Sequence, residues 1–378
     1  MLPTAIRTKP REHGCLVKII LIWMITIKEN EMYIRLKIIC ACLSFFWIQG
    51  CNKEKTTQMT EDNFNYAVTV TAPKEYPVEV HEGWLMDGKK QFICAMPKAG
   101  VTTGRWIVDG ASAGQGGSTI PYHLNLTYVA YAEKKFYTVD ADLPADKILQ
   151  EFRKGFNIKG RPDENKVRHI LHGTYDTFTI GAAPGGVIVV WLSAGHHRVE
   201  ICRLQGKESF VDRNDFYRNP HELSQEGFFE EGFTRIPDSM QTQIKEKGIP
   251  YGLWDRYRER FRYRFVLKPY DEKDKFTFQS HRYFNGETDL FYPQDLDRNE
   301  YISAAIPYNI DLSFTEYNTE ITFYFEEMLK IFGDFKKSDP DKPLDIILKP
   351  TFMYEDFKLS VKCGNKEVPL EKYKVKGV

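Results

Sequence analysis

The sequence has no excess of charge of either sign. Its 378 residues carry 52 lysines and arginines against 52 aspartates and glutamates, which leaves a formal net charge of zero. Without a net positive field, the chain has no general attraction for nucleic acid or for anionic lipid. We therefore expect no nucleic acid among its partners.

Cysteine is scarce in most of the chain. The first 51 residues hold four of the seven cysteines, which leaves Cys94, Cys202 and Cys363 for the remainder. Three widely spaced cysteines provide neither a disulfide framework nor a zinc motif. If one disulfide forms, Cys94 with Cys202 is the favoured pair. Three buried free thiols are the simpler interpretation, because buried cysteine is common.

The chain also lacks an apolar run long enough to cross a bilayer. Residues 16–27 and 38–48 are both shorter than the roughly 20 residues that a spanning helix needs. The second run follows Met32, Arg35 and Lys37, and it has the positive start and apolar middle of a secretory signal. Met32 is thus a natural start, with residues 1–31 as an over-extended gene model. An uncleaved anchor made of both runs is the alternative.

The end of the second run, Ile48-Gln49-Gly50-Cys51, resembles a bacterial lipobox. The resemblance implies lipidation of the Cys51 thiol, cleavage before Cys51 and acylation of the new amino terminus. Gln49 departs from the usual small residue. Two or three acyl chains hold a protein stably on a membrane. Asn52 is not the aspartate typical of inner-membrane retention, so we expect a lipid anchor on the outer membrane, on its periplasmic face.

What the sequence does contain is a β-rich body behind a polar tether. Residues 52–63 are polar, and period-two alternation such as that of residues 66–70 then predicts strands. The continuous apolar run 187–192 follows Pro184-Gly185-Gly186 and predicts a central, doubly buried strand. Apolar residues at helical spacing after Pro144 predict a helix.

The second part of the body repeats the order of the first. Residues 120–127 (IPYHLNLT) parallel residues 306–313 (IPYNIDLS), and after each come an aromatic stretch, a helix and two strands. We predict an α+β fold of two similar units, each a mainly antiparallel β-sheet packed by one helix. Chance similarity between two β-rich halves is the alternative. The predicted division is a signal peptide over 1–50, a lipidated tether over 51–63, a first unit over 64–206, a linker or insertion over 207–257 with a short helix at 238–247, and a second unit over 258–378.

Several segments together resemble a known family. They are residues 72–78 (APKEYPV), Ile120-Pro121, residues 131–137 (YAEKKFY), the helix after Leu143-Pro144 and residues 183–192 (APGGVIVVWL). With the lipoprotein start, these segments resemble the domain-of-unknown-function family 2931 of bacterial lipoproteins, mainly over residues 64–210. The resemblance implies an exported lipoprotein, and it implies no activity and no catalytic residue.

Two patterns suggest catalytic or metal chemistry, and neither is favoured. Ser112 in Gly-Ala-Ser-Ala-Gly matches the nucleophile elbow, which needs a strand before the serine and a helix after it. We expect a strand at 105–108 but a flexible loop around and after Ser112. The pairs His169 with His172 and His196 with His197 provide too few converging ligands for zinc, and the second pair is expected to cap a hairpin. No catalytic residue, metal or cofactor is expected.

Two aromatic segments are candidates for binding. Residues 254–267 (WDRYRERFRYRFVL) place Arg260, Arg262 and Arg264 in alternation with aromatic residues, the pattern of a strand with one wet face. These arginines, with Trp254, are possible ligands for acidic headgroups or an acidic protein. In residues 226–233 (EGFFEEGF), Phe228 and Phe229 either form a docking strip or pack onto one of the units.

The expected function is therefore that of a membrane-anchored lipoprotein, a non-enzymatic binding or structural protein of the cell envelope. An immunity-type lipoprotein that inhibits a periplasmic toxin is the alternative, which neighbouring genes for a secreted effector would favour. A serine hydrolase that uses Ser112 is a second, less favoured alternative.

Overall fold

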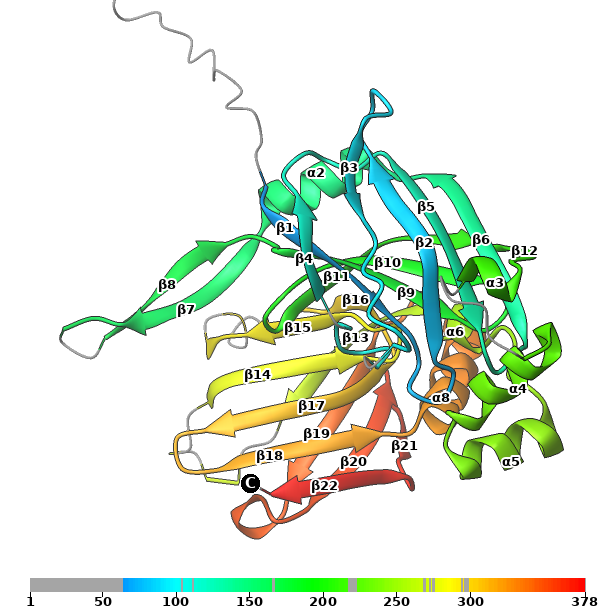
Figure 1. Ribbon diagram of the computed structural model, residues 1–378. Coiled ribbons are helices and arrows are strands. Elements are labelled where there is room, and N and C mark those ends of the chain that lie inside the picture. The colour runs from blue at the N-terminus through cyan, green and yellow to red at the C-terminus, as the bar shows by residue number, and fades with distance from the viewer. Residues whose placement is uncertain are drawn as a thin grey trace, which may run out of the picture. The chain divides into compact units, whose positions relative to one another are not determined.

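The computed structural model in Figure 1 describes residues 64–102, 105–110, 112–164, 167–216, 223–267, 270, 271, 273, 276–293, 295 and 299–377. The predicted signal peptide, the tether and Cys51 lie outside these residues. The described residues, from Phe64 onward, belong to one unit. Within the described ranges, no helix is long and apolar enough to span a membrane.

Two sheets and one helix build the first half, from β1 to β12. One sheet contains, in order, β4 (Ser112–Gly117), β1 (Tyr66–Thr71), β9 (Thr177–Ala183), β10 (Val187–Ala194) and β11 (His197–Gln205). The other contains β12 (Lys207–Ser209), β6 (Lys135–Asp142), β5 (His123–Ala130), β2 (Val78–Met86) and β3 (Phe92–Ala95). Side chains of both sheets and of helix α2 (Ala145–Lys154) share one apolar core.

The second half, from β13 to β22, has the same kind of plan. One sheet contains β16 (Ile302–Ala305), β13 (Arg260–Leu267), β19 (Leu344–Pro350), β20 (Phe357–Cys363) and β21 (Lys366–Pro369). The strands of the other are β22 (Tyr373–Gly377), β18 (Asn318–Phe323), β17 (Pro307–Phe314), β14 (Phe276–Tyr283) and β15 (Thr288–Phe291). Helix α8 (Phe325–Ser338) packs Met328 and Phe332 into the core between these sheets. A short 3-10 turn, Phe352–Tyr354, precedes β20.

The two halves are joined in one continuous sheet. Strand β11 of the first half pairs antiparallel with β15 of the second at Arg198 and Thr288. This pairing merges one sheet from each half into a ten-stranded sheet. We call the region around this pairing the seam.

The strands of the two halves follow one order. Read from β4, the first sheet runs β4-β1-β9-β10-β11, and its counterpart runs β16-β13-β19-β20-β21. The remaining sheets run β12-β6-β5-β2-β3 and β22-β18-β17-β14-β15. In each half, the first strand pairs in parallel with the strand that follows the helix, β1 with β9 and β13 with β19. Strand order and pairing direction thus correspond element by element.

Polar contacts recur at corresponding places in the two halves. The Tyr66 hydroxyl donates to the carbonyl of Thr119 at 2.7 Å, and the Tyr263 hydroxyl donates to the carbonyl of Ala305 at 2.6 Å. Thr119 and Ala305 each directly precede an Ile-Pro-Tyr sequence. The two carbonyls therefore occupy the same position relative to that sequence.

The residue after each Ile-Pro-Tyr sequence also makes corresponding contacts. His123 of β5 lies 2.6 Å from Asp140 and 2.7 Å from Asp142 on β6. Asn309 of β17 donates to Glu320 on β18 at 2.6 Å. In both halves this residue ties two neighbouring strands together through their side chains.

One element of the first half has no described counterpart in the second. The hairpin of β7 (Phe156–Pro162) and β8 (Arg168–Gly173) lies in the chain between α2 and β9, and Figure 1 shows it projecting from the body. Its strands pair only with each other. Within the described residues, the chain passes from α8 to β19 without such a hairpin.

Short helices connect the halves. They are α3 (Arg213–Phe216), α4 (Gln225–Thr234), α5 (Asp238–Lys247) and α6 (Leu253–Arg256). Side chains of α4 to α6 pack with Val187, Val189 and Trp191, on the face of β10 opposite the first core. Strand β10 is therefore covered on both faces, as its continuous apolar sequence predicts.

The structure confirms several local predictions and corrects others. The doubly buried strand at 187–192 and the helices after Pro144 and at 238–247 are present. Each half contains two sheets, however, and not the single sheet that we predicted, and β12 pairs with β6 within the first half. The α+β class is retained, and the division into separate domains stays a prediction.

The three cysteines of the described chain are free thiols. Cys94 and Cys363 are buried, and Cys202 is half-buried. The prediction of buried free thiols is therefore confirmed for Cys94 and Cys363. Burial raises the pKa of Cys94 to about 11 and that of Cys202 to about 12. Because the thiolate is the reactive form, these cysteines are poor nucleophiles at neutral pH.

Candidate binding site

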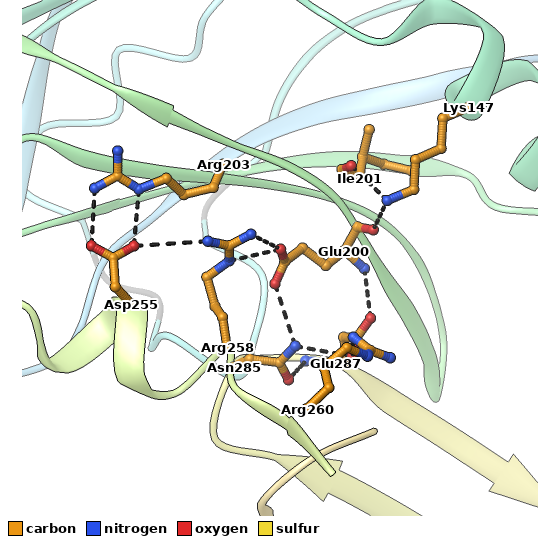
Figure 2. Close-up of polar contacts among 9 residues, drawn as sticks. All are labelled: Lys147, Glu200, Ile201, Arg203, Asp255, Arg258, Arg260, Asn285 and Glu287. Carbon is orange, nitrogen blue, oxygen red and sulfur yellow. Dashed lines mark hydrogen bonds and ion pairs between the residues drawn. The ribbon is translucent and has the colours of Figure 1, made fainter. Parts of the chain in front are cut away.

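The seam carries a network of ion pairs, shown in Figure 2. Glu200 of β11 accepts a hydrogen bond from Nε of Arg258 at 2.7 Å. The guanidinium of Arg203 binds both carboxylate oxygens of Asp255 on α6, at 2.9 and 3.0 Å. These bonds tie the first half to the residues that lead into β13.

A third carboxylate, that of Glu287, completes the network. Glu287 accepts from Arg260 at 2.8 Å, from Asn285 at 2.9 Å and from the backbone amide of Glu200 at 3.1 Å. The side chains of Glu200 and Glu287 are only 10% and 8% exposed. Because both carboxylates already have donors, the network is suited to holding the halves together.

A pocket of about 510 Å³ lies next to this network. Helix α6 contributes residues to both. The first half, the connecting segment and the second half all contribute to the wall of the pocket. Six aromatic side chains line it: Tyr76, Trp106, Trp254, Tyr257, Phe284 and Tyr308. We call it the aromatic pocket.

The rings of the aromatic pocket support one another. Trp254 meets Tyr76 nearly perpendicularly, with ring centres 5.4 Å apart, and lies 6.4 Å from Trp106. Phe284 meets Tyr308 at 5.3 Å. Such edge-to-face contacts are favourable beyond the burial of area. The wall of the pocket is therefore preformed.

Few polar groups reach this pocket. Burial raises the pKa of Tyr257 to about 12, so its hydroxyl is neutral at physiological pH. The indole Nε1 of Trp106, a residue 6% exposed, has no hydrogen-bond partner within the described part of the chain. Lys74, Glu75 and Arg105 are exposed where they border the pocket. This combination suits a ligand with an apolar face and a hydrogen-bond acceptor.

The residues that the sequence suggested for binding are separated in the structure. Trp254 is 3% exposed and lines the aromatic pocket. Arg260 belongs to the seam network, whereas Arg264 pairs with Asp345 at 2.7 Å and lines a different pocket of about 220 Å³. The guanidinium of Arg262 lies 5.6 Å from the ring centre of Tyr301. The alternation of wet and dry faces on β13 is as predicted, with Phe261 and Tyr263 buried.

The aromatic residues of α4 face the first half. Phe228 is 5% exposed, and its ring stacks parallel to that of Phe136 with 6.0 Å between centres. Phe229 is half-buried and lies 5.4 Å from Phe228. The sequence left open whether this segment forms a docking strip or packs onto one of the units. For Phe228, the structure shows packing onto the first half.

Ser112 lacks the geometry of a nucleophile elbow. It opens β4, which pairs antiparallel with β1, and no helix follows it before β5. The flexible loop predicted here was wrong for residues 112–117, which form a strand paired with β1. A Cβ on Gly116 would lie 1.9 Å from the carbonyl oxygen of Tyr66. The glycine allows close approach of two strands. The strand predicted at 105–108 was also wrong: Val108 N donates to Arg105 O at 2.8 Å and closes a turn.

The histidine pairs do not form a metal site within the described residues, where no group of three possible ligands is found. His196 is exposed in the turn between β10 and β11, which confirms the predicted hairpin. His197 is buried and stacks on Phe156, with ring centres 4.0 Å apart. His169 lies 3.0 Å from Asp163.

Sequence reasoning overlooked His281, a buried histidine in the second core. Burial lowers its pKa to about 3. Its Nδ1 has no partner within the described chain, so Nε2 carries the proton that binds Gln279 Oε1 at 3.1 Å. By register, its counterpart in the first half is Leu85: His281 faces Ile310 on β17, and Leu85 faces Leu124 on β5.

We expect His281→Leu to flatten the dependence of stability on pH. The folded pKa of about 3 lies below the ordinary value of 6.5, so the unfolded chain takes up the proton first as the pH falls. The stability contributed by the neutral ring is present above pH 6.5 and is lost progressively between pH 6.5 and 3. Between pH 7 and pH 5, the free energy of unfolding of the parent protein should fall by about 2 kcal/mol more than that of the variant. Urea unfolding at the two pH values measures this difference.

The control for this experiment is His196→Gln in the exposed turn, which should follow the curve of the parent protein. An unchanged difference between pH 7 and pH 5 in His281→Leu would contradict the assignment of a buried neutral ring.

The described chain is therefore a β-rich α+β protein whose halves meet beside an aromatic pocket. It belongs to the family described as "Protein of unknown function (DUF2931)", whose model matches residues 52–252. The match confirms the resemblance seen in the sequence. It includes the first half and helices α3 to α5, and it ends just before α6. No curated protein and no solved structure matches the chain.

Proposed function

We propose that this protein is a lipoprotein of the cell envelope, anchored to a membrane through Cys51, whose body binds a ligand and catalyses no reaction. The anchoring rests on the lipobox-like sequence at residues 48–51, after an apolar run of signal-peptide length. Asn52 favours the outer membrane, and we place the protein on the periplasmic face of that membrane. The polar residues 52–63 can extend to at most about 40 Å, which keeps the body near the bilayer.

The binding role rests on the aromatic pocket. A preformed apolar pocket with a few convergent polar groups is the default binding site of a globular protein. Here Lys74 and Arg105 at the border of the pocket offer donors, and both halves supply rings. We propose that the ligand is a small molecule with an apolar ring or face and a hydrogen-bond acceptor.

We also propose that the body consists of two similar units, the second outside the family match. The shared strand order supports this, as do the matching bonds of Tyr66 and Tyr263 to the residue before Ile-Pro-Tyr. In this arrangement the aromatic pocket arises only where the two units meet.

Matched variants test the pocket. Tyr308 lines it, whereas Tyr122, at the same place in the first Ile-Pro-Tyr sequence, is 44% exposed and is not among the residues that line it. Native mass spectrometry of protein purified from envelope extracts should show a bound small molecule that is retained in Tyr122→Ser and lost in Tyr308→Ser. Equal retention in both variants would exclude the pocket as the site.

Metabolic labelling with an alkyne fatty acid tests the anchor. The parent protein should take up label, and Cys51→Ser should lose nearly all of it. Cys94→Ser is the matched control, because that thiol is buried in the folded body. If Cys51→Ser takes up as much label as the parent, Cys51 is not the anchor.

A further inference from the structure

An apolar groove of about 490 Å³ lies between the β7/β8 hairpin and the second half. Phe156 and Ile158 of β7 form one wall. Phe278, Leu290 and Tyr292 form the other. The groove and the aromatic pocket have no lining residue in common. It is therefore separate from the aromatic pocket.

The hairpin is an addition to the plan that the two halves share. A two-stranded hairpin is at best marginally stable alone in water. This one contacts the second half, where the backbone amide of Lys159 donates to the Tyr292 hydroxyl at 2.8 Å. Ile170 and Leu171 on β8 nevertheless remain 40% and 50% exposed. These two residues do not line the groove, but an added element that keeps apolar side chains exposed indicates a binding surface.

Charge at the groove is mainly positive. Lys159 and Arg168 line it with exposed side chains. Its carboxylate, Asp176, accepts a hydrogen bond from Thr177 Oγ1 at 2.9 Å, and the two cations outnumber it. An anionic group at the groove would therefore meet two cations, while an apolar chain lies against the aromatic and aliphatic walls.

His197 provides an independent indication of a ligand. It lines the groove, is 8% exposed, and its Nε2 has no hydrogen-bond partner within the described chain. The other ring nitrogen bonds the backbone of Asn157, and burial lowers the pKa to about 4, so the ring is neutral. Nε2 is then a buried acceptor without a donor, which is unfavourable unless a hydroxyl or water binds there.

We propose that this groove binds a single-chain anionic amphiphile, with the acyl chain along Ile158 and Leu290 and the acidic head between Lys159 and Arg168. The ligand class includes free fatty acids and lysophospholipids, which share an acyl chain and a negative head. Only a lysophospholipid also carries a glycerol hydroxyl that can donate to His197. The inference goes beyond the proposed function, since it concerns a site outside the aromatic pocket.

The test uses a chain that begins at residue 51 and carries Cys51→Ser, so that no covalent acyl chain competes. This chain includes the whole unit from Asn63 onward. Dansylaminoundecanoic acid is the fluorescent probe. Palmitate and lysophosphatidylglycerol are the anionic competitors, and hexadecanol and hexadecyltrimethylammonium are the controls. We expect at least one anion to displace the probe at lower concentration than either control. Equal displacement by all four compounds overturns the proposal.

Variants locate the site. Arg168→Gln should weaken binding of the anions about threefold to tenfold and leave hexadecanol unaffected. Lys358→Gln on β20, another exposed cation, is its control. Leu290→Ser should weaken every amphiphile about tenfold, whereas Val368→Ser, at a residue 37% exposed on β21, should not.

Thermal melting of each variant separates loss of binding from loss of folding, and Ile158→Ser provides a second apolar variant on the hairpin. If folded Leu290→Ser and Ile158→Ser both bind as the parent does, the groove is not the site. Stronger displacement by lysophosphatidylglycerol than by palmitate would identify the lysophospholipid as the ligand, and the reverse order would identify the fatty acid.

Discussion

Replacing Gly232 by alanine is expected to lower the free energy of unfolding by about 2–3 kcal/mol, because it overpacks a buried contact. A Cβ at this position on α4 would lie 1.9 Å from Cδ1 of Tyr131. Tyr131 is fully buried, and its hydroxyl donates to Glu79 at 2.6 Å. The ring cannot move aside without breaking this bond, so the helix must shift away from the first half.

Gly333→Ala in α8 is the matched control. Nothing lies within 4 Å of a Cβ at Gly333. Because alanine has the higher helix propensity, this variant should be more stable than the parent by about 0.5–1 kcal/mol. Urea unfolding of both variants measures the two effects. Similar stabilities for Gly232→Ala and Gly333→Ala would show that α4 does not pack closely on Tyr131.

Replacing Glu200 by alanine should destabilise the protein by about 2–4 kcal/mol, because it leaves a partly buried arginine without its main partner. Arg258 loses its bond of 2.7 Å and, among the described residues, keeps a contact with Asp255 at 3.8 Å. The Arg258 side chain is 29% exposed, so water compensates part of the loss. Asn285 also loses an acceptor, at 3.3 Å.

Glu326→Ala is the control for this effect. It removes the contact between Arg256 and Glu326, whose side chains are 45% and 71% exposed. An exposed pair of this kind contributes at most about 0.5–1 kcal/mol, and we expect a change at the lower end of that range. If chemical unfolding shows equal effects for Glu200→Ala and Glu326→Ala, the seam network does not stabilise the joined halves.

Much of the secondary structure was predictable because its signals are local. The run 187–192 is apolar at every position and is a strand covered on both faces. The helices after Pro144 and at 238–247 follow from spacing and from charges near their ends. The alternation on β13 correctly assigned Phe261 and Tyr263 to the core and Arg262 to the surface.

The aromatic pocket was not predictable in the same way. Its aromatic residues come from positions as far apart as Tyr76 and Tyr308. Trp254 was selected for the arginines that follow it in the sequence, yet in the structure it lies among aromatic rings. The partners of Arg260 and Arg264, Glu287 and Asp345, lie on other strands. No spacing within one segment carries this information.

Glycine misled the prediction around Ser112 for a related reason. A glycine-rich stretch is typical of a loop, but here Gly116 is needed because β4 lies against the carbonyl of Tyr66. Whether a glycine provides freedom or permits close approach depends on what lies beside it. That neighbour is 50 residues away in the chain.

By itself, the sequence determined several of the strands and helices, the resemblance to the family and the presence of a lipobox-like segment. These are properties of short stretches, in which periodicity, turn residues and motif spacing act over a few positions. Only the tertiary structure decided that each half has two sheets, that β11 and β15 join them, and that six aromatic rings meet around one pocket. Strand pairing and close packing bring together residues far apart in the chain, and their energies depend on contacts that no local pattern records.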